Sequence, residues 1–201
     1  MKLNINLVNQ DNSNSCGQVA LKVVCDYFGK EVSIDKLKEL TYPDKSGVTW
    51  SQGILLGALE LGFKGKLYSK VLGLDESNFE LEYYRNNMDK LEEVTQKIDF
   101  FETEIFKFGG EMFEKTLSLD ELLSKVDVNN LAIILIDWGV VDNRDKNFFH
   151  YVVISGYDES YVYVYDGSKE KQTHFPIKRD IFDKARKIKG TDEDLIFIHK
   201  G

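Results

Sequence analysis

The chain has 201 residues and a formal net charge of -8 at pH 7, with 42% hydrophobic and 30% charged residues. This length and composition predict one folded domain that can bury a core without disulfides. The acidic charge disfavours a general nucleic-acid binder, which would need clustered lysine and arginine. The N-terminal segment lacks the apolar region of a signal peptide, and the longest nearly apolar run, residues 131–136, is too short to span a membrane. We therefore expect a cytoplasmic protein without membrane insertion.

Two cysteines, Cys16 and Cys25, fall on one predicted helix, nine residues apart. At a rise of about 1.5 Å per residue they would lie roughly 13 Å from each other, which is too far for a disulfide. Neither belongs to a Cys-x-x-Cys motif, so we expect no metal site and no cofactor. Two free thiols are typical of a reducing compartment.

Helices predominate in the first seventy residues. Apolar side chains recur at helical spacing over residues 16–28, and Gly29 is suited to end that helix. The other elements expected in this part are a short strand over residues 3–8, a helix capped by Ser33, a helix with a capping box from Thr49 to Gln52 that ends at Gly62, and a strand over residues 63–69.

Residues 77–116 form a separate amphipathic segment. From Tyr84 to Phe108 the apolar residues step by three or four, which predicts one long helix or two shorter ones ending near Gly109. We interpret this segment as a helical insertion packed on the core. A lid over a site and a homodimer contact are the alternatives.

Strands predominate after the insertion. A capping box joins Ser118 to Glu121 and predicts a short helix. The elements expected after it are a buried strand over residues 131–137, a polar loop over 138–147, a hairpin of strands 150–156 and 161–166, a helical or irregular segment over 175–188, and a last strand over 195–199. This order predicts an α+β fold over residues 1–201, in which an N-terminal helical layer packs on a mostly antiparallel C-terminal sheet.

Cys16 is the candidate nucleophile. It follows a polar, turn-rich stretch and opens a helix, where the helix dipole and unpaired N–H groups favour the thiolate. The same N–H groups can bind an oxyanion, and the amide of Gln10 could provide a second donor. We expect Gly17 to let a substrate backbone approach the sulfur. The alternative role for a free cysteine is a small buried hydrophobe, which describes Cys25 better.

His150 and Asp166 are the candidate base and its orienting acceptor. Side chains alternate along a strand, so His150 shares a face with the aliphatic residues of the first hairpin strand and Asp166 with those of the second. If the aliphatic faces match, the two side chains lie one rung apart or directly opposite. Asp166 can then accept from one ring nitrogen while the other addresses Cys16. His174 and His199 have no comparable partner.

These residues resemble a known family. The segment from Gln10 to Leu21 is similar to the signature Gln-x5-Cys-Gly-x-x-(Ala/Ser)-Leu of bacteriocin-processing, double-glycine peptidases, which are papain-like domains usually fused to ABC transporters. The block that starts at His150 and the later Asp166 resemble the family's His and Asp segments. The family usually has proline after its Asp, where this chain has Gly167, and it lacks an insertion like residues 77–116.

The resemblance implies a papain-like fold in which Cys16 is the nucleophile, His150 the base, Asp166 the orienting residue and Gln10 an oxyanion donor. It implies a cysteine peptidase that acts on a peptide or protein substrate. Two alternatives stay open. The acyl-enzyme could pass to an amine, as in a transglutaminase-like acyltransferase, or the chain could be a non-catalytic peptide-binding module of the same fold.

Overall fold

A computed structural model describes residues 1–201 apart from residues 7, 9–13 and 168–172. The helices of the described residues are α1 (Cys16–Tyr27), α2 (Ile34–Thr41), α3 (Ser51–Glu60), the 3-10 helix η1 (Glu76–Glu80), α4 (Glu82–Asn87), α5 (Leu91–Lys107), α6 (Leu119–Ser124), α7 (Trp138–Val141) and α8 (Arg179–Ala185). The strands are β1 (Lys64–Ser69), β2 (Glu111–Glu114), β3 (Asn130–Asp137), β4 (Phe149–Tyr157), β5 (Tyr161–Tyr165), β6 (Phe175–Lys178) and β7 (Leu195–His199).

The described strands form one seven-stranded sheet in the order β2-β1-β7-β3-β4-β5-β6. Only the pair of β1 with β2 is parallel among them; the other neighbours are antiparallel. The α+β prediction, with an antiparallel sheet built mainly from the C-terminal half, is therefore confirmed. Strand β3 is buried along almost its whole length because both of its edges are paired and helices cover it.

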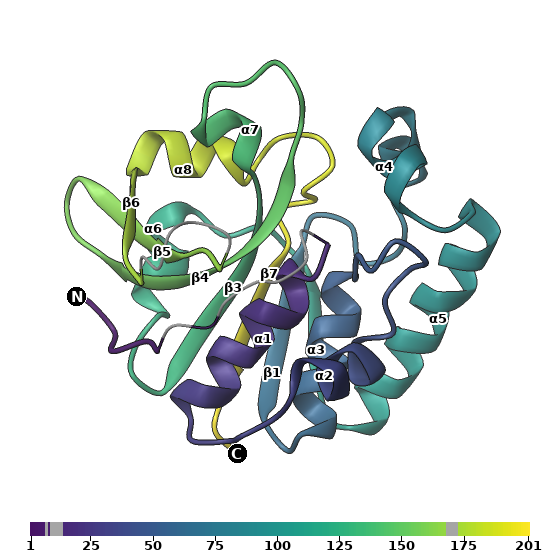
Figure 1. Ribbon diagram of the computed structural model, residues 1–201, viewed down its shortest axis with the longest axis horizontal. Helices are drawn as coiled ribbons and strands as arrows, with labels where there is room; N and C mark the ends of the chain where they lie inside the picture. The colour runs from purple at the N-terminus through teal and green to yellow at the C-terminus, as the bar shows by residue number, and fades with distance from the viewer. Residues whose placement is uncertain (7, 9–13, 168–172) are drawn as a thin grey trace.

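Helices cover the sheet from different segments of the chain. In Figure 1, α1 lies at the lower centre of the view, with α2, α3 and α5 following to its right, whereas α7 and α8 lie in the upper part of the view, above β5. The core between these helices and the sheet is aliphatic and aromatic. None of the described helices is long and apolar enough to cross a membrane.

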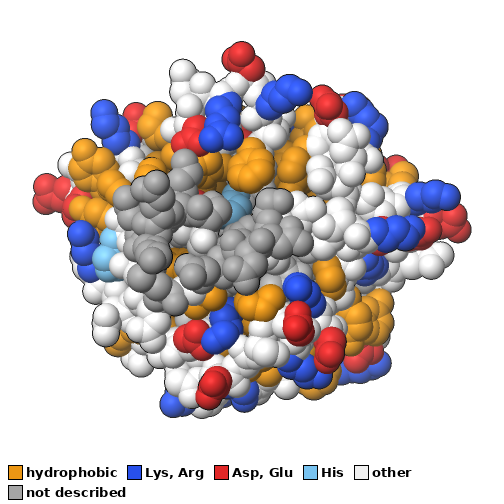
Figure 2. Space-filling view, viewed as in Figure 1, with side chains coloured by type: hydrophobic (Ala, Val, Ile, Leu, Met, Phe, Trp, Pro, Cys, Tyr) orange, Lys and Arg blue, Asp and Glu red, His pale blue; other side chains and the backbone are white. Residues whose placement is uncertain are grey.

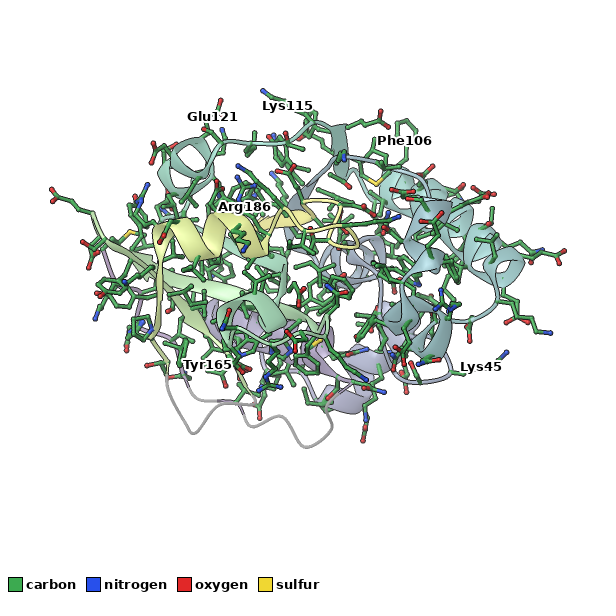
Figure 3. The ribbon with its side chains drawn as sticks, turned by 90° about the horizontal axis from the view of Figure 1, so that it is seen from above. Lys45, Phe106, Lys115, Glu121, Tyr165 and Arg186 are labelled. Carbon is green, nitrogen blue, oxygen red and sulfur yellow. The ribbon has the colours of Figure 1, made fainter. Side chains whose placement is uncertain are left out.

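The segment 77–116 packs on the core through one face. It contains α4 and α5, and the side chains of Tyr84, Val94, Ile98, Phe101 and Ile105 are buried. The sequence allowed either one long helix or two shorter ones, and the structure has two. Gly109 follows the second helix with φ +73°. Figure 3 shows Phe106 of α5 pointing away from the body of the protein, where it is 83% exposed.

The segment also contributes strand β2, which the sequence pattern did not predict. Its four residues pair with β1 from Lys66 to Ser69. Four residues are too few for a clear alternation of polar and apolar side chains, so a strand this short has little sequence signal.

Several other local predictions differ from the structure. The described residues of the stretch 3–8 form no strand of the sheet; Leu3 instead donates its N–H to the carbonyl of Ser155 at 2.7 Å. Helix α3 starts one residue after the predicted position with Trp50 as N-cap, because the Thr49 hydroxyl donates to the carbonyl of Thr41 at 2.8 Å and caps nothing. The caps at Ser33 and Ser118 are as predicted.

Two C-terminal segments are more ordered than expected. The loop 138–147 begins with the short helix α7, which Asp137 caps by accepting from the N–H of Gly139 at 2.9 Å. The segment 175–188 consists of strand β6 followed by helix α8. The strand was missed because Pro176 suggests irregular structure, and at this outer strand of the sheet a proline costs no ladder bond on its open side.

Candidate active site

Cys16 is the first residue of α1. Ser15 is the N-cap, but its side chain does not cap the helix. The N–H groups of the first turn, beside the Cys16 sulfur, are therefore not occupied by a capping side chain. The Cys16 side chain is almost fully buried, with the residue 8% exposed. Beside it, a Cβ on Gly17 would lie 2.5 Å from Cγ2 of Thr49 and 2.9 Å from Cδ1 of Ile54. Gly17 therefore permits close packing of α1 on α3, rather than the substrate approach expected from the sequence.

His150 and Asp166 come together across the β4–β5 hairpin. Ile154 pairs with Val164, and the register shifts at the next residue of β4 through a bulge. When this pairing is continued away from the hairpin turn, His150 lies two residues beyond the position opposite Asp166, on the same face of the sheet. This is the arrangement that the alternation of side chains predicted. Nε2 of His150 lies 2.8 Å from Oδ1 of Asp166, and both residues are 2% exposed. Because the carboxylate can only accept, Nε2 carries the hydrogen and Nδ1 is left free to interact with Cys16, whose influence on the pKa of His150 shows that the two side chains are neighbours.

Aromatic rings hold the imidazole in place. Phe148 stacks on it, with ring centroids 5.9 Å apart and an interplanar angle of 15°, and Trp138 meets it edge-on at 5.8 Å. Asp137 fixes this arrangement, since its carboxylate accepts from the N–H of Phe148 at 2.8 Å and from Nδ2 of Asn147 at 2.6 Å. Asp137, the last residue of β3, thus supports the ring of His150 through the residues that lead into β4.

The environment of Cys16 favours its thiolate. Burial alone would raise the pKa of this thiol, but the hydrogen bond to His150, the charge of that imidazole and the backbone N–H groups of Tyr151 and Gly17 lower the pKa below the ordinary 9.0. For His150, burial lowers the pKa, whereas the hydrogen bonds to Asp166 and Cys16 raise it, to about 10. The two groups therefore shift in the directions of a thiolate–imidazolium pair.

Cys25 provides an internal contrast. It is fully buried in the last turn of α1. Burial and the neighbouring carboxylate of Asp26 raise the pKa of its thiol to about 12. A buried thiol without an imidazole is thus held neutral in the same helix. The other histidines lie elsewhere: Nδ1 of His174 is 2.9 Å from the Ser155 hydroxyl, and His199 ends β7.

A narrow pocket of about 30 Å³ opens beside Cys16. Its walls are largely aromatic and apolar, and they include Tyr83, Tyr84 and Met88 of the segment 77–116. The segment therefore contributes directly to the surroundings of the thiol. The polar residues of the lining are Thr49, Gln52, Asp75, Asp192 and Asp194.

Sequence reasoning missed the acidic residues of this pocket. Asp192 and Asp194 lie in the turn before β7, and Asp75 lies before η1, more than a hundred residues away along the chain. Nothing in their local patterns distinguishes them from exposed turn residues. Gln10, the predicted oxyanion donor, lies outside the described residues.

No three or more His, Cys, Asp or Glu side chains are arranged to hold a metal ion in the part of the chain that the structure describes. On the face shown in Figure 2, basic and acidic side chains are interspersed over the residues drawn in colour. This face has no continuous basic surface there of the kind that binds a phosphate backbone.

Comparison with solved structures shows the same fold in three peptidase-related proteins. The peptidase domain of Streptococcus ComA, a bifunctional ABC transporter of a quorum-sensing pathway, is 18% identical, with 97% of this chain and 98% of that chain covered and a TM-score of 0.54. A double-glycine-motif protease from an AMS/PCAT transporter, solved in complex with a leader peptide, is 14% identical over 100% of this chain and 94% of that chain, with a TM-score of 0.56. A protein described as a C39-like peptidase from Bacillus anthracis is 15% identical over 100% and 98%, with a TM-score of 0.58.

These likenesses show a common papain-like fold, as the sequence resemblance implied. A search of curated proteins found no match to the chain. A family model described as guanylylate cyclase matches residues 5–198, which is nearly the whole chain. The chain therefore belongs to the guanylylate cyclase family by sequence, and it has the fold of double-glycine peptidase domains.

Proposed function

We propose that the protein is a cysteine-dependent peptidase in which Cys16 is the nucleophile, His150 the general acid and base, and Asp166 the residue that orients the imidazole. The observation that carries this proposal is the buried array of the three side chains, in which the thiol pKa is lowered and the imidazole pKa raised. A purely structural cysteine has no need of such a neighbour, as Cys25 illustrates.

The reaction would proceed through a thioester. The Cys16 thiolate attacks the carbonyl carbon of the scissile amide, and the carbonyl π electrons move to the oxygen. When the tetrahedral intermediate collapses, the C–N bond breaks and the proton on Nδ1 of His150 passes to the leaving amine. Nδ1 then takes a proton from water, the hydroxide attacks the thioester, and the C–S bond breaks to release the acid and restore the thiolate.

Oxyanion stabilisation would come from the start of α1. The backbone N–H of Cys16 belongs to the first turn, whose N–H groups have no partner within the helix. It can donate to the developing oxyanion, aided by the positive end of the helix dipole. Gln10 remains the proposed second donor, on the basis of its position in the motif.

A peptide is the proposed substrate because the fold neighbour from the AMS/PCAT transporter binds a leader peptide. The family name points instead to cyclisation of GTP. A triphosphate needs cationic groups that balance its charge as the phosphoryl group is displaced. Among the described residues that line the pocket there are three aspartates and no lysine or arginine. The charge of the site therefore supports the peptide substrate over the nucleotide.

The test is cleavage of a synthetic peptide library by the purified protein, read by mass spectrometry. Cleavage should occur with the wild type and with a Cys25→Ala control and should be lost in Cys16→Ala. Addition of a primary amine separates hydrolysis from acyl transfer, since a transferase would give amide products in place of acids. Peptide binding without a covalent Cys16 adduct would indicate the non-catalytic module, and cyclic GMP formed from GTP at an unchanged rate in Cys16→Ala would contradict the proposal.

A further inference from the structure

The pocket beside Cys16 contains a buried hydrogen-bond acceptor with no donor. Gln52 is 4% exposed, and its Nε2 donates to the carbonyl of Leu72 at 2.9 Å. That bond fixes the orientation of the amide, because only the nitrogen can face a carbonyl oxygen. Oε1 of Gln52 finds no hydrogen-bond donor among the described residues. A buried acceptor is stabilised by a donor, and a ligand that enters the pocket could supply one.

The same pocket concentrates carboxylates. Asp75, Asp192 and Asp194 contribute to its lining. Burial raises the pKa of Asp194 to about 7 and that of Asp192 to about 6. Asn78 donates to the carboxylate of Asp192 at 2.7 Å, and the hydroxyls of Ser51 and Ser69 partly offset the effect of burial on the pKa of Asp194. A cation placed in the pocket would favour the ionised forms of Asp192 and Asp194 further.

The turn that carries two of these carboxylates is conformationally unusual. Asp192 and Glu193 have φ values of 47° and 54°, in the left-handed region that residues other than glycine rarely adopt. The N–H of Lys70 holds the turn by donating to the carbonyl of Asp192 at 2.7 Å. Backbone of this kind persists where the surrounding structure imposes it, and it is enriched at ligand sites.

The shape of the pocket limits the cation. Trp50, Tyr83, Tyr84 and Phe149 supply aromatic walls, and the volume is only about 30 Å³. The described acidic residues are not arranged to hold a metal ion. A slender alkyl chain can pack between the aromatic rings, and a charged donor at its end can bind the amide oxygen of Gln52 and the carboxylates.

We propose that this pocket is a specificity subsite for a basic side chain, lysine in particular, of the peptide residue next to the scissile bond. The inference rests on the proposed peptidase function and adds a substrate class to it. The ammonium group would donate to Oε1 of Gln52 and to the carboxylates of Asp192 and Asp194, while the methylene stem would lie between the aromatic rings.

Two peptide chloromethyl ketones test the subsite on the unaltered protein. Acetyl-Leu-Lys and acetyl-Leu-norleucine reagents have side chains of similar length and differ in the ammonium group. The lysine reagent should alkylate Cys16 at least about tenfold faster at neutral pH, since a charge-assisted hydrogen bond contributes about 1.5–3 kcal/mol. Equal rates, or a faster norleucine reagent, would overturn the proposal. Intact-protein mass spectrometry with peptide mapping gives both rates.

Matched variants assign the effect to the pocket. Asp194→Asn and Asp192→Asn should each reduce the lysine-to-norleucine ratio by about tenfold. Asp99→Asn removes one negative charge from an exposed position on α5 and should leave the ratio unchanged. A reduction of the same size in Asp99→Asn would show that overall charge, and not the subsite, sets the preference.

A binding measurement separates this inference from the proposed function. Cys16→Ala protein should bind a fluorescent lysine peptide at least about tenfold more tightly than its norleucine analogue by anisotropy. This result requires no reactive sulfur. If Cys16 of the wild type reacts no faster than an ordinary thiol while the lysine preference persists, the peptidase proposal fails and the subsite stands. A reactive Cys16 without the lysine preference would overturn the subsite and leave the peptidase proposal standing.

Discussion

Replacing His150 with alanine should return Cys16 to the behaviour of an ordinary buried thiol. Burial raises the pKa of Cys16, and the imidazole is the largest influence that lowers it. Cys25, a buried thiol of the same helix without an imidazole partner, has a pKa of about 12 against the ordinary 9.0. At neutral pH, a thiol with a pKa of about 12 contains about a thousandfold less thiolate than a thiol with a pKa of 9.0. Because the N–H groups of Tyr151 and Gly17 stay in place, we expect a loss of alkylation rate between about tenfold and a thousandfold.

The assay is the rate of iodoacetamide labelling of Cys16 as a function of pH, with peptide mapping to separate it from Cys25. His199→Ala is the matched control. His199 pairs with Asn130 at the start of β3, whereas His150 pairs with Ile136 near its end, so the control histidine lies at the opposite end of the sheet. Unchanged labelling of Cys16 below pH 7 in His150→Ala, in a protein with a wild-type circular dichroism spectrum, would refute the reasoning.

Three further substitutions test the surroundings of the pair. Asp166→Asn removes the carboxylate that raises the pKa of His150, so this pKa should fall from about 10. The alkaline limit of peptide cleavage should then move to lower pH, and kcat/KM should drop about tenfold or more. An unchanged pH–rate profile would contradict the orienting role. Gly17→Ala introduces a Cβ only 2.5 Å from a side-chain atom of the turn before α3, so urea denaturation should show a loss of about 1–3 kcal/mol in unfolding free energy, and a variant as stable as the wild type would disprove the close packing. Asp137→Ala leaves buried N–H donors without their acceptor and frees Phe148 from the imidazole. Both the unfolding free energy and the labelling rate of Cys16 should therefore fall. Loss of stability alone would limit Asp137 to a structural role.

Elements with a strong local pattern were predictable from the sequence. Helix α1 has apolar side chains at regular helical spacing and a glycine after its end, and the continuous apolar run of β3 marks a buried strand. Strand parity also placed His150 and Asp166 on one face, because burial of the aliphatic side chains of both strands fixes the register, and a slip of one residue would turn those side chains to the other face.

Features set by tertiary contacts could not be predicted in the same way. Thr49 has the composition of a helix cap, but the carbonyl of Thr41 competes for its hydroxyl. The sequence around Gly17 suggests room for a substrate, and only the placement of α3 against it shows that the space is filled. The acidic side of the pocket combines Asp75 with Asp194, and no local pattern relates two turns so distant in sequence. The acceptors of the pocket therefore became visible only in three dimensions.

The most direct test of the central claim is the ultraviolet difference absorbance of the thiolate, measured for the wild type against Cys16→Ser across the pH range. The pairing of Cys16 with His150 predicts a thiolate signal that appears at a lower pH than that of an ordinary thiol, because the imidazole carries the compensating charge and lowers the pKa of Cys16. A signal that appears only as the pH rises through about 9, as for an isolated thiol, would contradict the thiolate–imidazolium pair and the chemistry proposed from it.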